Sequence, residues 1–373
     1  MRVAVAAECF LPQRNGVTNS VLRILEQLEA YGHEALVIAP GPGSSHEGKT
    51  PVERIPSFRL PMYRDLPVAI PSGRIESALR AFSPDIVHLA APAVLGPAVA
   101  DAARDMGKPV LAIYQTDFAG FARRYCSGLA EPVMWKLLRR AHRHVDLTLA
   151  PSTSAAWQLS SHEIDPVAIW PRGVDTELFH PARRSVLVHR QLAPRGEVVV
   201  GYTGRLASEK RVQLLESLAD VPRIKLVVIG DGPARARLER RLPDARFLGW
   251  HNGVDLATLV ATLDVFVHTG PHETFCQAIQ EALASGVPVV APAMGGPLDL
   301  VHHGQNGWLY PPDAPELMAQ AVDSLAADSR QRRAMGEHAR ASVEHRTWKA
   351  VGHQLLAYYE ALLNGPSSSG LAA

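Results

Sequence analysis

Residues 198–211 read VVVGYTGRLASEKR and contain the pattern on which our fold prediction rests. The apolar run at their start is rich in β-branched residues, which predicts a buried strand. Gly204 then indicates a turn in which the backbone can approach a ligand closely. Short apolar runs of this kind alternate along the chain with longer segments of helical period, a pattern typical of parallel sheets with crossover helices.

The alternation occurs as two successive series, so the 373 residues are expected to form two domains. The proline- and glycine-rich segment 41–71 is expected to be mostly loop. We predict an α/β protein with two doubly wound, Rossmann-like domains that face a cleft, with ligands at the carboxyl ends of the strands. Strands are predicted at residues 3–6, 35–39, 86–89, 110–113 and 147–150 in the first series, and at 198–202, 225–229, 245–248, 265–268 and 287–291 in the second.

A polar, proline-containing stretch separates the two series, and a linker is expected there. The end of the chain has one more segment of helical period and then a Ser/Gly/Ala tail. The predicted parts are a first domain at 1–180, on the acceptor side, a linker at 181–196, a second, donor-binding domain at 197–347, a C-terminal helix at 348–364 and a disordered tail at 365–373.

The charge and cysteine content exclude several classes of protein. With 38 Lys and Arg against 37 Asp and Glu, the formal charge is +1, so no overall field attracts nucleic acid and no nucleic-acid partner is expected. Cys9, Cys126 and Cys276 lack the paired spacings of zinc or redox sites, which predicts a reducing cytosol and no metal site. The longest apolar stretch, residues 89–100, is about half the roughly 20 residues that a membrane-spanning helix needs.

The loop after the first strand, residues 10–18 (FLPQRNGVT), contains Gly16 and leads into a helix whose N-terminal amides could face a diphosphate. It lacks the Gly-x-Gly-x-x-Gly spacing, and no Gly-x-x-x-x-Gly-Lys-Ser/Thr motif occurs in the chain. These absences argue against a nicotinamide or flavin dinucleotide and against a P-loop NTPase. Taken alone, Gly16 is more typical of an ordinary turn.

Two cations five residues apart, Arg205 and Lys210, follow the turn at Gly204. Charge that develops on a leaving diphosphate needs fixed positive groups in a dry cleft. The planar guanidinium of Arg205 and the point charge of Lys210 would supply them without a metal ion. The alternative is a pair of solvated surface charges.

Two carboxylates eight positions apart, Glu273 and Glu281, lie in residues 268–281 (HTGPHETFCQAIQE), across a strand-to-helix junction. If Phe275 starts the helix, Glu273 lies at its N-terminal edge, where the macrodipole favours an anion, and Glu281 lies about two turns in. One carboxylate would then bind sugar hydroxyls and the other the ribose of a nucleotide. The alternatives are a helix cap for Glu273 and a solvated helical glutamate for Glu281.

The stretch 268–290 resembles the Glu-x7-Glu signature of retaining glycosyltransferases of the GT-B fold, in the large family numbered four. Further motifs of that family occur in the same order along most of the chain. They are residues 172–179 (RGVDTELF), 204–210, 228–233 (VIGDGP), 247–250 (FLGW), 286–290 (GVPVV) and 306–309 (NGWL). The resemblance implies the two-domain GT-B fold, with a C-terminal helix that crosses back to the first domain.

Three N-terminal segments, 7–12 (AECFLP), 15–21 (NGVTNSV) and 115–121 (QTDFAGF), look like the actinobacterial GDP-mannose-dependent α-mannosyltransferases that act on glycolipids. This resemblance implies transfer of mannose from GDP-mannose, with retention, to a lipid-linked sugar of glucuronosyl diacylglycerol or phosphatidylinositol mannoside type. One alternative is a UDP-sugar donor, glucosyl or sulfoquinovosyl. A nucleotide-sugar 2-epimerase and a nonenzymatic sugar-nucleotide-binding module are the others, and the Glu-x7-Glu signature argues against the epimerase.

The family pattern also implies roles for residues of this chain. Arg205 and Lys210 would bind the donor diphosphate and stabilise the leaving group, Glu273 would hold the donor hexose, and Glu281 would bind ribose. The donor-binding set also includes Gly16 beside the diphosphate, Gly204, the backbone amide of Phe275 near the sugar phosphate, and Trp250 near the base.

Three residues depart from that pattern. Gln115 stands where a His is frequent, Cys276 where a Gly is common, and Arg172 where Asn often precedes Gly-Val-Asp. Gln115 and Asp117 are expected to complete the catalytic set by orienting acceptor or donor hydroxyls. Because no residue is identified as a nucleophile, a front-face mechanism follows, in which the leaving diphosphate accepts the proton of the acceptor. No metal and no cofactor besides the donor substrate are implied.

A basic amphipathic stretch within residues 118–144 could rest on anionic lipid headgroups, with roughly 1 kcal/mol from each basic residue. The alternative is a solvated basic helix face. With a lipid acceptor implied, the expected location is the cytoplasm, peripheral to the inner face of the cell membrane. The candidate residues are Arg123, Arg124, Lys136, Arg139, Arg140 and Arg143.

Overall fold

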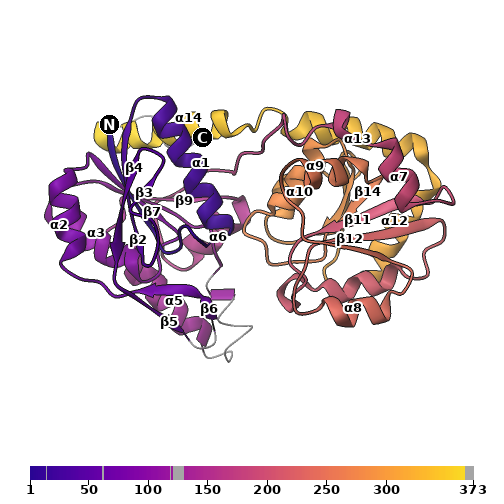
Figure 1. Ribbon diagram of the computed structural model, residues 1–373, viewed down its shortest axis with the longest axis horizontal. Coiled ribbons are helices and arrows are strands. Elements are labelled where there is room, and N and C mark those ends of the chain that lie inside the picture. The colour runs from indigo at the N-terminus through magenta and orange to yellow at the C-terminus, as the bar shows by residue number, and fades with distance from the viewer. Residues whose placement is uncertain (14, 61–62, 118, 121–129, 366–373) are drawn as a thin grey trace. The chain divides into compact units, whose positions relative to one another are not determined.

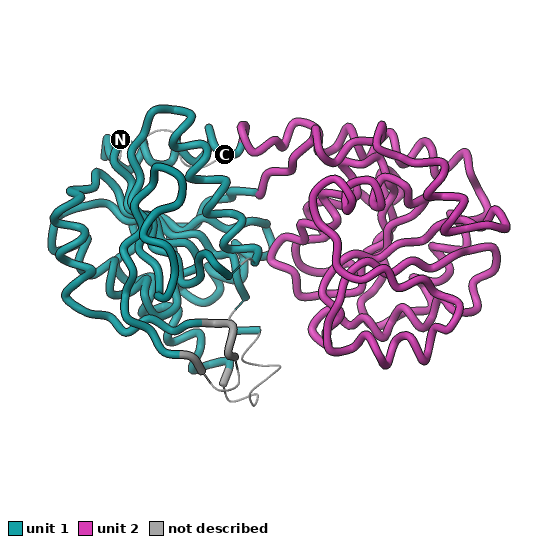
Figure 2. The backbone as a smooth tube through the Cα atoms, in the orientation of Figure 1, with its two compact units in different colours: residues 1–171, 351–373 teal, residues 172–350 magenta. Residues whose placement is uncertain are grey.

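The computed structural model describes residues 1–13, 15–60, 63–117, 119–120 and 130–365, which form two compact units (Figures 1 and 2). Unit 1 comprises Met1–Pro171 and Val351–Ala373, and unit 2 comprises Arg172–Ala350. The first boundary thus precedes the expected linker at 181–196. That segment instead forms the short helices η1 (Pro181–Arg183) and α7 (Val186–Leu192) of unit 2.

Unit 1 is built on a largely parallel sheet whose described strands have the order β10-β9-β8-β7-β1-β2-β4-β3. Strand β1, buried almost throughout, pairs with β2 on one side and β7 on the other, so the strand order reverses beside it. The bounds are β1 (Arg2–Ala7), β2 (Glu34–Pro40), β3 (His46–Glu47), β4 (Thr50–Ile55), β7 (Ile86–Ala90), β8 (Val110–Ile113), β9 (Leu147–Ala150) and β10 (Val167–Ile169), with helices α1 (Gly16–Ala30), α2 (Arg74–Phe82), α3 (Leu95–Asp105), α5 (Ala130–Ala141) and α6 (Thr153–Ser161).

The segment 41–71 is not mostly loop. It contains β3 and β4, which extend the sheet of unit 1, and a separate antiparallel pair, β5 (Ser57–Leu60) and β6 (Tyr63–Ala69). The prolines in these strands are Pro51 of β4, which pairs with the two-residue edge strand β3, and Pro67 of the two-stranded ribbon, and such positions need few ladder hydrogen bonds.

Helix α14 (Trp348–Leu363) begins at the end of unit 2 and, from Val351 onward, belongs to unit 1. The fully buried Tyr359 hydroxyl lies 2.5 Å from His88 Nδ1 on β7. The indole of Trp170 donates to the carbonyl of Val351 at 2.8 Å. Among the described residues, no helix is both long and apolar enough to cross a membrane.

Unit 2 contains a parallel sheet whose described strands have the order β13-β12-β11-β14-β15-β16. Strand β11 pairs with both β12 and β14, so the order reverses between β11 and β14. In doubly wound sheets ligands bind at this point, outside the carboxyl ends of the strands. The strands are β11 (Val198–Thr203), β12 (Ile224–Ile229), β13 (Arg246–Gly249), β14 (Val265–Val267), β15 (Val289–Pro292) and β16 (Gly307–Tyr310). The helices are η2 (Ser208–Lys210), η3 (Val212–Leu218), α8 (Arg235–Arg241), α9 (Gly253–Thr262), α10 (Gln277–Ala284), α11 (Pro297–Leu300), α12 (Pro315–Ala327) and α13 (Ser329–Val343).

Candidate active site

The loop after β11 passes close to the loop after β12, and glycines make this possible. Gly204 has φ +146°, and a Cβ on Gly230 would lie 2.0 Å from the carbonyl oxygen of Gly204. Beyond this crossing, the side chain of Arg205 is 70% exposed and reaches Glu209 only at 4.0 Å. Its guanidinium is therefore accessible to a ligand.

Lys210, at the end of η2, lies against the loop that follows β14. The Thr269 hydroxyl donates to the Lys210 carbonyl at 2.6 Å, which ties the two loops together. The Lys210 ammonium then reaches Glu273, with Nζ 2.5 Å from Oε1. The structure thus brings together two of the predicted site residues at the switch point of the sheet.

Glu273 is a largely buried carboxylate, 14% exposed, that is held from two sides. His268 Nε2 lies 3.1 Å from the same oxygen, Oε1, that contacts Lys210. Burial favours the neutral acid, but the charge of Lys210 and the contact with His268 outweigh it and lower the pKa of Glu273 to about 2. Its other oxygen, Oε2, lies outside these two contacts and is suited to accept hydroxyl groups of a sugar.

His268 was not among the residues singled out from the sequence. It directly follows β14, and its side chain is 3% exposed. Burial acts to lower the pKa of the imidazole, but its neighbours Cys276 and Glu273 outweigh burial and raise it to about 9. The available signal was a histidine placed at the carboxyl end of an otherwise apolar strand.

Helix α10 begins at Gln277, two residues after Phe275, the expected start. Glu273 therefore lies in the preceding loop rather than at the helix edge, and Glu281 lies about one turn into the helix. The helix starts late because Cys276, its N-cap residue, has left-handed backbone angles, φ +82° and ψ +75°. This is a conformation that glycine adopts more readily.

The residues of α10 near Glu281 face the first residues of unit 2. Gln277 donates to the Gly173 carbonyl at 3.1 Å, and Gln280 donates to the Arg172 carbonyl at 2.9 Å. Burial raises the pKa of Glu281 to about 7, although the charge of Arg172 and the contact with Gln277 act to lower it. Arg172, one of the departures from the family pattern, thus belongs to the surroundings of the predicted ribose ligand.

The other predicted donor ligands lie at the same edge of unit 2 or in unit 1. Trp250 follows β13 directly and is 70% exposed, whereas Phe275 is buried in the core of unit 2. Gly16 is the first residue of α1 in unit 1, where the Asn15 side chain caps the helix by accepting from the Thr18 amide at 2.9 Å.

Gln115 and Asp117 follow β8 in unit 1, as expected. The Asp117 carboxylate accepts from the Gly120 amide at 2.7 Å and from the Tyr114 hydroxyl at 3.3 Å. These contacts give Asp117 a role in shaping its own loop. Its predicted catalytic role and that of Gln115 remain predictions.

The basic stretch lies partly on α5. Arg123 and Arg124 fall outside the described residues. Helix α5 buries Trp135 and Leu138 against unit 1 and exposes its opposite face. Lys136, Arg139, Arg140 and Arg143 are all exposed, and Arg139 is paired with Glu163 at 3.3 Å.

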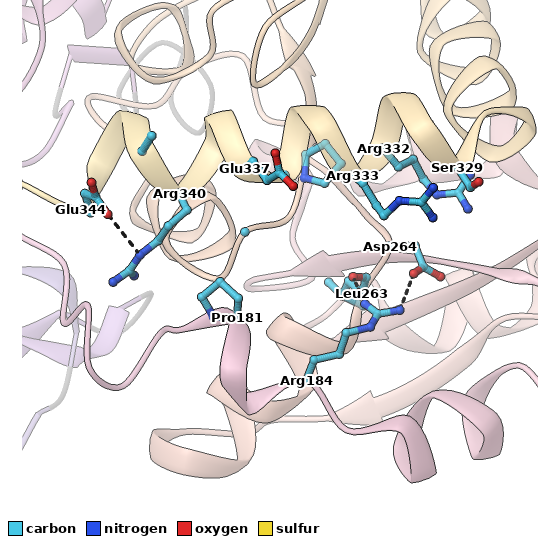
Figure 3. Close-up of a pocket in the computed structure, with 14 residues that line it drawn as sticks. Pro181, Arg184, Leu263, Asp264, Ser329, Arg332, Arg333, Glu337, Arg340 and Glu344 are labelled. Carbon is cyan, nitrogen blue, oxygen red and sulfur yellow. Dashed lines mark hydrogen bonds and ion pairs between the residues drawn. The ribbon is translucent and has the colours of Figure 1, made fainter.

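A pocket of about 710 Å³ lies at the opposite, amino edge of the unit 2 sheet, beside Asp264 and Pro288, which precede β14 and β15 (Figure 3). Three of its arginines bind backbone carbonyls at helix C-termini. Arg184 donates to Leu263 at 2.8 Å after α9, Arg332 to Ala326 at 3.0 Å in α12, and Arg340 to Ala284 at 2.8 Å in α10. Cations at these ends complement the helix dipoles.

Comparisons with known proteins agree with this architecture. The family described as Glycosyltransferase Family 4 matches residues 14–178, and Glycosyl transferases group 1 matches residues 187–342. A GDP-mannose-dependent alpha-mannosyltransferase of Mycolicibacterium smegmatis is 47% identical, over 97% of this chain and 98% of its own. A protein of the same name from Corynebacterium glutamicum is 46% identical, over 96% of this chain and 88% of its own. The structure of Anabaena HepE in complex with UDP has a TM-score of 0.78 at 19% identity, covering 96% of this chain and 100% of that one, and is similar in fold.

Proposed function

Because the chain belongs to glycosyltransferase family 4, we propose that it transfers mannose from GDP-mannose to a glycolipid, with retention of the anomeric configuration. The observation that carries the proposal is the 46–47% identity, over nearly the whole chain, to two GDP-mannose-dependent α-mannosyltransferases. The donor site of unit 2 supports it, since Arg205, Lys210 and Glu273 lie at the switch point of the sheet.

The chemistry proposed for this site is charge stabilisation. Arg205 and Lys210 bind the diphosphate and balance the negative charge that it gains as the glycosidic bond breaks. Glu273 accepts hydroxyls of the hexose through Oε2, while Oε1 is held by Lys210 at 2.5 Å. Lys210 thereby touches both the sugar-binding carboxylate and the leaving group, and positions one against the other.

Retention is proposed to follow a front-face route. The departing diphosphate oxygen accepts the proton of the acceptor hydroxyl, and that hydroxyl oxygen bonds to the anomeric carbon on the same face. The protein contributes positioning and fixed charge, and no resident metal or cofactor takes part. Gln115 and Asp117 are proposed to orient hydroxyls from unit 1, and Glu281 the ribose.

The acceptor is proposed to be a lipid-linked sugar of glucuronosyl diacylglycerol or phosphatidylinositol mannoside type, reached at the inner face of the cell membrane. The exposed face of α5 supports this location. Val133 and Leu137, one turn apart, are 59% and 52% exposed, and the exposed Lys136 and Arg140 flank them. An apolar stripe between basic side chains is suited to an anionic lipid surface.

Donor choice is tested by calorimetric titration with GDP-mannose, GDP, UDP-glucose and UDP, each with and without EDTA. We expect micromolar binding of the two guanine ligands alone, unchanged by EDTA. Transfer of labelled mannose to glucuronosyl diacylglycerol and to phosphatidylinositol mannoside then identifies the acceptor. Preference for the uridine ligands would replace GDP-mannose by a UDP-sugar, and dependence on a metal would contradict the proposed chemistry.

A further inference from the structure

We infer that His268 is a positioning residue of the donor site, which fixes the Glu273 carboxylate so that Oε2 faces the donor hexose. The inference rests on the proposed function, in which Glu273 binds hexose hydroxyls. Its basis is the contact between His268 Nε2 and Glu273 Oε1 at 3.1 Å, with both side chains buried to 14% exposure or less.

Glu273 needs a second anchor because of where it lies. It belongs to the loop between β14 and α10, outside regular structure. The contact from Lys210, at 2.5 Å, comes from a flexible side chain that acts as a point charge and does not fix the plane of the carboxylate. A second donor on the same oxygen, from another direction, restricts that rotation.

The ring and the backbone of His268 lie against residues of three other strands. Its ring lies parallel to the Tyr202 ring on β11, at an interplanar angle of 8° and a centroid distance of 6.3 Å. The His268 amide donates to the Val290 carbonyl of β15 at 2.9 Å. The Tyr310 hydroxyl of β16 donates to the His268 carbonyl at 3.0 Å. His268 therefore connects a loop carboxylate to the rigid sheet.

Gly270 supplies an independent sign that this contact shapes the loop. A Cβ at position 270 would lie 3.0 Å from His268 Nε2 and 3.1 Å from Glu273 Oε1. These distances are shorter than ordinary van der Waals contact, so any side chain there presses on the two atoms that form the bond. The glycine keeps the space between the loop and the bond open.

A metal ion is the competing use of this cluster, since the ligand atoms of His268, Glu273 and Cys276 all lie within 4.8 Å of one another. The Lys210 ammonium argues against it, because its positive charge contacts the same carboxylate oxygen that a cation would take. A proton on His268 Nε2 is compatible with Lys210. The N–H donates to Glu273 Oε1, and it does not require the additional ligands that a metal ion would. The raised pKa of His268, about 9, is consistent with that proton.

The test compares ligands with and without the hexose. His268→Phe keeps a ring beside Tyr202 but removes the N–H, and His268→Gln keeps a donor. For His268→Phe we expect the Kd for GDP to stay within about twofold of wild type, and the Kd for GDP-mannose to rise by about tenfold or more, as expected for a lost hydrogen bond to a charged group. His268→Gln should recover part of the lost affinity. Gly270→Ala should raise the Kd for GDP-mannose by less than His268→Phe does and leave the Kd for GDP nearly unchanged.

His142→Phe is the matched control, because His142 is also buried and its imidazole forms a hydrogen bond with Thr148 at 2.9 Å in unit 1. It should leave both Kd values unchanged. Equal weakening of GDP and GDP-mannose by His268→Phe, or no weakening of either, would overturn the inference while leaving the proposed function intact. If wild type binds only uridine ligands, the donor proposal fails and the same comparison with UDP and UDP-glucose decides the role of His268. Wild-type protein that binds none of the four ligands would overturn both.

Discussion

The two edges of the unit 2 sheet both gather positive side chains, but they use them differently. At the amino edge, Arg184, Arg332 and Arg340 donate to carbonyls at the ends of α9, α12 and α10. At the carboxyl edge, Arg205 keeps a side chain that is 70% exposed, and Lys210 contacts the Glu273 carboxylate in the loop after β14.

The difference follows from the geometry of a parallel α/β sheet. Helix C-termini, with their unpaired carbonyls, gather at the amino edge, and strand ends followed by ligand-binding loops gather at the carboxyl edge. Arginines at the first edge therefore stabilise the fold, although they line a pocket of about 710 Å³. An arginine whose N–H groups are bound to backbone carbonyls has few left for a ligand, whereas the exposed guanidinium of Arg205 keeps its N–H groups available.

Arg205→Ala gives the largest effect that this comparison implies. If Arg205 stabilises the leaving diphosphate as proposed, removing its charge should lower kcat at least about a hundredfold. The measurement is the initial rate of mannose transfer at saturating donor. Arg333→Ala is the control, because Arg333 is exposed and lines the pocket at the amino edge. If Arg205→Ala kept near-wild-type turnover, Arg205 would have no place in the mechanism.

Arg340→Ala should have the opposite profile. Its side chain is 20% exposed and donates to the carbonyls of Phe179 and Ala284 at 3.0 and 2.8 Å. Leaving these carbonyls without a partner should lower the free energy of unfolding by about 2 kcal/mol, with kcat of the folded protein unchanged. Urea denaturation measures the first and initial rates the second. A large loss of kcat without loss of stability would mean that the amino edge takes part in function.

The carboxyl edge was predictable from the sequence because motif and topology point to the same place. Gly204, Arg205 and Lys210 follow one apolar run and Glu273 follows another, and parallel strands end together. The amino edge was not, since nothing in the spacing of Arg184 or Arg340 shows which carbonyls they will meet. Such contacts depend on tertiary packing between distant segments.

Three local features could not be predicted from the sequence, for physical reasons. The start of α10 was misplaced because Cys276 has a left-handed backbone conformation that its residue type does not suggest. The strands of segment 41–71 could not be recognised because prolines, which usually interrupt strands, are tolerated near the sheet edge in β4 and in the β5–β6 ribbon. His268 lacked a motif, and only the structure places its ring beside Glu273.

Donor binding at the carboxyl edge should depend on pH through Glu281. Burial raises the pKa of Glu281 to about 7, with Arg172 acting in the opposite sense. Below that pH the carboxyl is mostly protonated and would accept ribose hydroxyls poorly, so the Kd for GDP-mannose, whose diphosphate does not titrate here, should fall about tenfold between pH 6 and pH 8, the ratio of ionised fractions. Calorimetry at several pH values measures this, and Glu281→Gln should remove the dependence. An unchanged pH profile in Glu281→Gln would assign the titration to another group.

The same carboxyl should contribute to the pH dependence of stability. Because its folded pKa lies above the ordinary value of 4.5, the folded state binds more protons than the unfolded state between about pH 4.5 and 7. The contribution of Glu281 to the free energy of unfolding therefore falls as pH rises through this window. Glu281→Gln, compared with wild type by urea denaturation at pH 5 and pH 8, isolates that contribution.

The smallest effect concerns α5. An arginine that is free to bind lipid and one that is already paired with a carboxylate can be compared there within one helix. Arg140 is exposed, whereas Arg139 is paired with Glu163 at 3.3 Å. If α5 rests on anionic lipid, Arg140→Ala should weaken binding to phosphatidylglycerol-containing vesicles about fivefold, since one basic residue near the surface contributes about 1 kcal/mol. Arg139→Ala should weaken it less, because its charge is already partly balanced by Glu163.

Arg237→Ala is the control for net charge, because Arg237 is an exposed arginine on α8 of unit 2. The measurement is sedimentation with vesicles. Equal losses in all three variants would show that net charge alone, and not the α5 face, governs the association.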